Sequence, residues 1–210
     1  MYNNGKQILF GFYNGKFISK GYFDNNLIFN SNVVTITINP TPNDAKVTFS
    51  DYGIGIISND GKSITVKKDT VVNYTVSADK YVSKTQSIVV DSTKSINVSL
   101  DKIIYTLTIN PTPSNATVTL TASGYSQSGN SITVPIDTNV TYTVSKTHYV
   151  TQTNSISMTS NNTLSINLNR QKYTLTINPT PSDSTVTLTA NGATQSGNSI
   201  TVDSETTVNY

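Results

Sequence analysis

The stretch Tyr105–Thr112 reads YTLTINPT, and it decides the fold because it recurs along the chain. Near copies stand at Thr35–Thr41 (TITINPT) and at Thr174–Thr180 (TLTINPT), so that the shared asparagine recurs after 71 and then after 68 residues. Similarity at such a period is typical of repeated structural units. The second and third copies are identical at 28 of 38 positions when Tyr105–Tyr142 is aligned with Tyr173–Tyr210.

Each copy alternates apolar and hydroxyl-bearing side chains. Tyr105, Leu107 and Ile109 are separated by threonines, and Thr117–Thr121 continues the pattern. A period of two places apolar side chains on one face of a strand and polar side chains on the other. Short strands at intervals of about 8–12 residues, separated by Gly, Asn or Pro, predict a small antiparallel β-sandwich. The Asn-Pro-Thr-Pro step predicts the end of the first strand, because proline has no N–H to donate.

The composition excludes several classes of protein. Among the 210 residues there is no Cys, and only 12% of the side chains are charged, with a net charge of +2. Without Cys there is no disulfide framework, thiol nucleophile or iron–sulfur ligand set. A charge so close to zero gives little reason to bind nucleic acid. Thr, Ser and Asn together make up about 40% of the chain, which favours strands over helices.

We divide the chain into four parts on this evidence. They are an N-terminal β-meander, two complete sandwich repeats and an incomplete third repeat, at residues 1–32, 33–103, 104–172 and 173–210. The segments between repeats are short and contain neither Gly nor Pro, so we expect stiff connections. Because the third copy stops at the counterpart of Tyr142, we expect the polypeptide to continue beyond Tyr210. Completion by another chain is the alternative.

The first thirty residues differ from the repeats, because they hold eight of the 18 aromatic side chains. Asn14-Gly15 lies between two apolar stretches and is a strong hairpin signal. A segment of this size cannot enclose so much apolar surface by itself. It therefore either folds onto the first sandwich or, as we favour, docks on another protein or on copies of itself. The residues predicted to dock are Phe10, Phe12, Phe17, Tyr22, Phe23, Leu27 and Phe29.

The repeats resemble the PEGA domain. The resemblance is carried by Pro113-Ser-Asn-Ala, by Ser131-Ile-Thr-Val and by the spacing from Tyr142-Thr-Val to Tyr149-Val. It implies a short β-sandwich that serves as a structural or interaction module in prokaryotic surface and phage proteins, without catalytic residues. The string Tyr13–Phe29 is similar to the N-terminal meander of tailed-phage virion proteins, including those of crAss-like phages. That similarity implies attachment to a phage particle.

No residue pattern predicts an enzyme, a cofactor or a metal site. His148 is the sole histidine and is expected in a surface turn, since a lone histidine cannot form a metal cluster. Carboxylates are sparse, and Asn59-Asp60-Gly61 is better explained as a hairpin turn than as a calcium loop. As sugar-stacking candidates the chain offers Tyr81, Tyr125 and Tyr149, although Tyr81 and Tyr149 recur at the same register and so favour packing roles.

Our main hypothesis is therefore a non-enzymatic structural virion protein of a tailed bacteriophage. Residues 1–30 attach to other virion proteins (capsid, portal or tail), and the repeats form a head or tail fibre or decoration. Self-association and a host surface glycan at the distal end are further partners, whereas nucleic acid and membrane are not expected. The first residues lack the pattern of a secretory signal, and no apolar run is long enough to span a bilayer. The alternatives are a bacterial cell-surface adhesin or stalk, and a carbohydrate-binding module.

Overall fold

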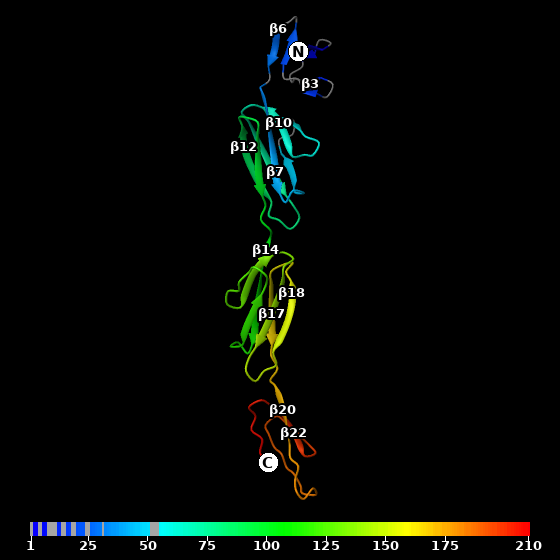
Figure 1. The fold of residues 1–210 in the computed structure, drawn as a ribbon, viewed down its shortest axis with the longest axis vertical. Coiled ribbons are helices and arrows are strands. Elements are labelled where there is room, and N and C mark those ends of the chain that lie inside the picture. Colours follow the sequence, from blue (N-terminus) through cyan, green and yellow to red (C-terminus); the bar gives the residue numbers. More distant parts are fainter. Residues whose placement is uncertain are drawn as a thin grey trace. The chain divides into compact units, whose positions relative to one another are not determined.

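A computed structural model describes residues 32–50 and 55–210 in full, and the backbone of residues 2–3, 6–7, 12–13, 16–17, 20–23 and 26–30. These described residues form strands and turns without any helix, so the predicted all-β class is confirmed. The chain divides into two compact units, Met1–Ile103 and Ile104–Tyr210. Figure 1 shows the strands of each unit.

The N-terminal segment consists of hairpins where its backbone is described. Its strands pair antiparallel as β1 with β2, β3 with β4 and β5 with β6. Their bounds are β1 Tyr2–Asn3, β2 Lys6–Gln7, β3 Phe12–Tyr13, β4 Lys16–Phe17, β5 Lys20–Phe23 and β6 Asn26–Asn30. The β3–β4 pairing agrees with the hairpin predicted from Asn14-Gly15, and each hairpin is a separate two-stranded sheet.

The first sandwich packs a sheet in the order β13-β7-β10-β9 against a sheet in the order β12-β11-β8. The first sheet comprises β7 Val33–Thr41, β9 Gly55–Ile57, β10 Ser63–Lys67 and β13 Lys94–Ser99. The second comprises β8 Lys46–Phe49, β11 Thr70–Ser77 and β12 Lys84–Val90. Along β7, Val34, Ile36 and Ile38 are buried while the intervening threonines lie on the outer face, as the alternation predicts.

The second sandwich has the same plan without a counterpart of β9, with sheets in the orders β16-β14-β19 and β15-β17-β18. Its strands are β14 Ile104–Thr112, β15 Thr117–Thr121, β16 Ser131–Pro135, β17 Asn139–Ser145, β18 Gln152–Ser157 and β19 Asn162–Asn167. Leu107, Ile109, Val140 and Met158 are fully buried between the two sheets. On the outer face, hydroxyls pair across the strands, as Thr106 does with Thr133 at 2.8 Å.

One strand pair in each complete sandwich is parallel, in addition to the antiparallel pairs that the pattern predicts. β13 runs parallel to β7, and β19 runs parallel to β14. The two partners are far apart in sequence, and a parallel pair requires such a long crossover. Alternation of side chains is the same in both kinds of ladder, so strand direction was not readable from the sequence.

The Asn-Pro-Thr-Pro step ends the first strand of both complete sandwiches, as predicted, although each strand includes the first proline of the step. β7 continues through Pro40 to Thr41, and β14 continues through Pro111 to Thr112. Pro40 is tolerated because the ladder with β10 has already ended at Thr37, leaving β13 as the partner there. Proline fits a strand at a position without an N–H partner. The second proline of each motif begins the turn, where the Pro42 carbonyl accepts from the Ala45 N–H at 3.1 Å.

The third module has one described sheet, in the order β20-β22-β21. Its strands are β20 Lys172–Thr176, β21 Gln195–Ser196 and β22 Ser199–Asp203. Leu188, Ile200 and Val202 are buried, whereas Leu175 and Ile177 are only partly buried. The residues of the second sandwich that correspond to Leu175 and Ile177 are Leu107 and Ile109, which are fully buried beneath a covering sheet.

Candidate functional site

The aromatic docking residues predicted in the N-terminal segment lie outside the residues whose side chains the structure describes. The backbones of Phe12 and Phe17 are opposite one another in the β3–β4 hairpin. Tyr22 faces Leu27 in the β5–β6 ladder, next to an irregularity between Gly21 and Tyr22. Docking through these residues therefore stays a prediction.

A cluster of polar side chains joins the second sandwich to the third module. His148 lies in the turn after β17, and Ser204 and Glu205 follow β22. The Nδ1 atom of His148 is 2.8 Å from the Ser204 hydroxyl, and its Nε2 atom is 3.3 Å from a Glu205 carboxylate oxygen. His148 and Glu205 both have positive φ angles, of 67° and 65°. The two turns thus place their side chains against each other.

Arg170 completes this cluster from the segment between the modules. Its guanidinium donates to the Ser204 carbonyl at 2.9 Å and lies 3.5 Å from the Glu205 carboxylate. It also stands 5.5 Å from the centre of the Tyr149 ring, a distance typical of a cation–π contact. The backbone is tied as well, because Gln171 donates to the His148 carbonyl at 2.8 Å and accepts from Ser204 at 2.7 Å. The connection is therefore held by side chains and backbone together.

The side-chain types in this cluster are those of a hydrolase triad, but their placement does not suit catalysis. A triad needs a serine hydroxyl that a substrate can reach, beside a histidine that takes its proton. Ser204 is only 5% exposed, so its hydroxyl is closed to a substrate. We interpret the arrangement as a junction that fixes one module to the next.

A depression of about 480 Å³ lies beside the junction. Charged side chains from both modules line it, namely Lys146, Arg170 and Glu205, together with His148. Lys146 donates a hydrogen bond to the Asn115 side-chain oxygen at 2.5 Å. The cations of this depression already have partners, which favours a structural role for them.

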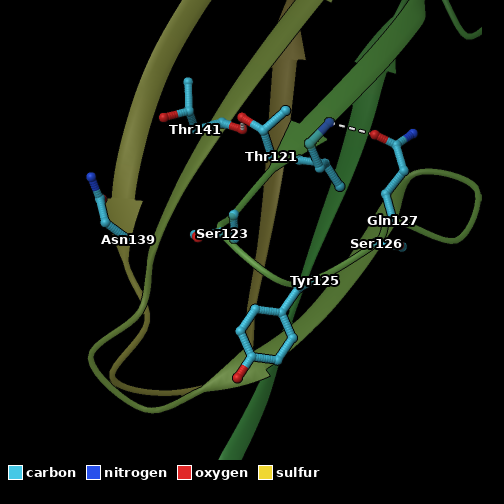
Figure 2. Close-up of a pocket in the computed structure, with 9 residues that line it drawn as sticks. Thr121, Ser123, Tyr125, Ser126, Gln127, Asn139 and Thr141 are labelled. Atoms are coloured by element: carbon cyan, nitrogen blue, oxygen red, sulfur yellow. Dashed lines mark hydrogen bonds between the residues drawn. The ribbon is translucent and has the colours of Figure 1, made fainter.

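A second depression, of about 690 Å³, lies on the second sandwich beside the loop that follows β15 (Figure 2). Its lining includes Thr121, Ser123, Tyr125, Asn139 and Thr141, all uncharged. The Tyr125 side chain is 43% exposed. This concave surface combines an exposed aromatic ring with several uncharged polar groups, features typical of small-molecule sites.

The loop beside this depression is held by Gln127. Its amide oxygen accepts from the Leu120 N–H at 2.5 Å, and its amide nitrogen donates to the carbonyls of Val118 at 3.1 Å and Gly129 at 3.0 Å. Figure 2 shows the Gln127 side chain reaching back to the strand, with the Tyr125 ring extending from another part of the loop. The loop is therefore anchored independently of the tyrosine.

The structure separates the three tyrosines that the sequence offered as sugar candidates. Tyr81 and Tyr149 are partly buried and pack against the cores of their sandwiches, while Tyr125 projects from its loop. Over the described residues, no group of His, Cys, Asp and Glu side chains is arranged to hold a metal ion. The same residues include no helix long and apolar enough to cross a membrane.

Sequence reasoning missed the junction cluster. We expected His148 in a surface turn, and it is in a turn, but one that contacts the next module. A signal was present, because the register positions of His148 and Arg170 are basic in the first copy too, as Lys80 and Lys102. Glu205 likewise has an acidic counterpart in Asp137. The recurrence of charge type at positions whose identity varies was the available clue.

Comparison with known proteins finds a family match within the second sandwich. Residues 104–167, which span β14 to β19, match the family described as "Head fiber dimeric protein-like domain". The match supports a head-fibre-like domain in this part of the chain, which suggests a phage structural protein. No curated protein matches the chain.

Two solved structures are similar at low identity. The Bacillus anthracis TIE protein is 14% identical with a TM-score of 0.38, over 66% of this chain and 34% of that one. The streptococcal ancillary pilin is 13% identical with a TM-score of 0.23, over 67% of this chain and 63% of that one. This chain spans less than two thirds of either protein.

Proposed function

We propose that this protein is a structural component of a tailed-phage virion, attached by residues 1–30 and displaying its sandwiches as a head fibre or decoration. The observation that carries the proposal is the match of residues 104–167 to a head-fibre domain. The first sandwich has the same strand plan apart from the additional strand β9, which supports a chain with more than one domain of this kind. The motifs of the repeats favour PEGA-like domains, and the string Tyr13–Phe29 favours a crAss-like phage particle, as the finer assignment.

The junction cluster supports a structural role. A fibre has to transmit force from one module to the next, and a connection held by Arg170, His148 and Glu205 resists bending better than a Gly/Ser linker. The hydroxyl-rich outer faces, with a low density of charge, suit prolonged exposure to solvent. The proposed partners are capsid, portal or tail proteins.

We also propose that the chain forms a homo-oligomer in the particle. The matched family is described as dimeric, and we extend that description to this chain. Sedimentation velocity of the purified protein is expected to give twice the mass of the 22.7 kDa chain. A species that stays at the mass of one chain at every concentration would contradict a stable dimer.

The location of the protein tests the proposal most simply. Antibodies raised against residues 104–167 are expected to label purified phage particles in immunogold electron microscopy. Labelling of the envelope of uninfected bacteria, with none on particles, would instead identify a cell-surface adhesin. Particles from a phage lacking the gene serve as the control.

A further inference from the structure

The depression beside the loop that follows β15 is lined by polar side chains that the proposed structural role does not require. Every side chain that lines it is uncharged, in contrast to the charged depression at the junction. Over the described residues, no hydrogen bond engages the Ser123 or Tyr125 hydroxyls or the Asn139 side-chain amide. These groups are therefore available to a ligand.

The third module shows that Tyr125 is not needed to build this loop. Gln195 makes the same three contacts as Gln127, with the Leu188 N–H at 2.6 Å and the Val186 and Gly197 carbonyls at 2.8 and 2.6 Å. The turn also repeats, with φ of 79° at Gly124 and 72° at Gly192. Ala193 occupies the position of Tyr125. The loop forms with either residue, so an exposed tyrosine there has a reason other than folding.

We propose that this depression binds the ring of a neutral pyranose sugar. The Tyr125 ring offers an apolar face on which the C–H face of a sugar can stack. The hydroxyl of Ser123 and the amide of Asn139 lie along the same depression and can bond to the hydroxyls of the sugar (Figure 2). Thr121 and Thr141 add further hydroxyls, although Thr141 also pairs with Ser155 at 2.9 Å.

The absence of charge in the lining determines the class of sugar. A sugar acid would bring a carboxylate into a depression where no cation lines the wall. The cost of removing that carboxylate partly from water would not be offset by a cation, whereas a neutral hexose loses little hydration free energy. The open form of the site and its single aromatic ring predict weak binding, with a Kd of about 1 mM for one ring.

Titration of the full chain with methyl glycosides tests the proposal. The probes are methyl glucoside, galactoside, mannoside and N-acetylglucosaminide, with methyl glucuronide as the acidic comparison. In ¹H–¹⁵N spectra, we expect at least one neutral probe to shift the amides of residues 121–127 and 139–141. Saturation-transfer spectra should place the ring of Tyr125 against the bound sugar.

Two matched variants assign the binding to Tyr125. Tyr125→Ala reproduces the alanine of the third module, so its melting temperature should be unchanged while binding weakens by about tenfold or more. Tyr173→Ala removes another exposed tyrosine, which lies outside the depression, and should bind like the parent chain.

Three results would overturn the proposal. One is the absence of local shifts with all the neutral probes at about ten times the expected Kd. Another is binding by Tyr125→Ala equal to that of the parent, and the third is tighter binding of the glucuronide. Because the titration uses purified protein, its outcome is independent of whether the chain resides on a virion.

Discussion

Leu107 and Leu175 hold the same position in two identical stretches, TLTINPT, and yet their surroundings differ. Leu107 is fully buried between two sheets, whereas Leu175 is partly buried in a module with one described sheet. The local sequence sets the strand and the face, but the burial of a side chain depends on what packs over that face. The contribution of this leucine to the free energy of unfolding therefore differs between the two copies.

This difference gives a measurable prediction. Leu107→Ala is expected to destabilise the second sandwich by about 2–5 kcal/mol, because it removes contacts and leaves a cavity. Leu175→Ala should cost less, about 2 kcal/mol or below, because part of that side chain is already in water. Hydrogen exchange of peptides from each module during urea unfolding measures both. Equal losses would contradict the packing difference.

Tyr74 predicts an alkaline limit to the stability of the first sandwich. Burial raises the pKa of Tyr74 above its ordinary value of 10.0. The unfolded chain then releases this proton at lower pH than the folded chain does. The contribution to stability is complete below about pH 10 and is lost as the pH rises through the raised pKa of the folded state.

Urea unfolding of the parent and of Tyr74→Phe at about pH 8 to 11 checks this prediction, because that range brackets the ordinary tyrosine pKa. The phenylalanine variant should lose stability less steeply above pH 10, although it also loses the hydrogen bond from Tyr74 to Gln86. Tyr125→Phe, at an exposed position, is the control and should follow the parent. A parallel decline in all three proteins would show that Tyr74 is not responsible.

At the scale of elements, alternation predicted the strands but not their partners. Tyr105, Leu107 and Ile109 were expected on one face, and all three contribute to the core of the second sandwich. The parallel pairing of β13 with β7 was not expected, because the sequence carries the period of a strand and not its direction. The same limit applies to the junction cluster, because the sequence of one repeat does not reveal which of its turns contacts the next module.

The junction makes a prediction at this scale. Arg170→Ala removes the hydrogen bond to the Ser204 carbonyl, the contact with Glu205 and the stacking on Tyr149. We expect the Ser204 amide, which bonds to Gln171, to exchange about 5–30 times faster, since these contacts together are worth about 1–2 kcal/mol. Hydrogen exchange followed by NMR measures this rate.

Lys172→Ala is the matched control for Arg170→Ala. Lys172 pairs with Asp203 at 2.9 Å, but both side chains are substantially exposed to solvent. Exposed pairs contribute about 0–1 kcal/mol, so the Ser204 amide should change little. If the two variants accelerated exchange equally, the cluster around Arg170 would not be what holds the modules together.

At the scale of the whole molecule, the sequence predicted a repeated all-β chain with a distinct N-terminal segment. The repeats were readable because a fixed period and a fixed alternation are both visible in one sequence. The loop depression was only partly readable, since Tyr125 was one of three candidate tyrosines and burial was needed to separate them. The docking role of residues 1–30 follows from composition and stays a prediction.

The central claim is that the N-terminal segment attaches the chain to a phage particle and that the sandwiches do not. The most direct measurement is quantitative mass spectrometry of purified particles assembled with three chains: the full chain, one lacking residues 1–30 and one lacking residues 173–210. Circular dichroism of each purified chain verifies that the sandwiches are folded. The account predicts that loss of residues 1–30 abolishes incorporation, while loss of residues 173–210 leaves it at the level of the full chain. Incorporation of the chain without residues 1–30 at the full level would contradict it.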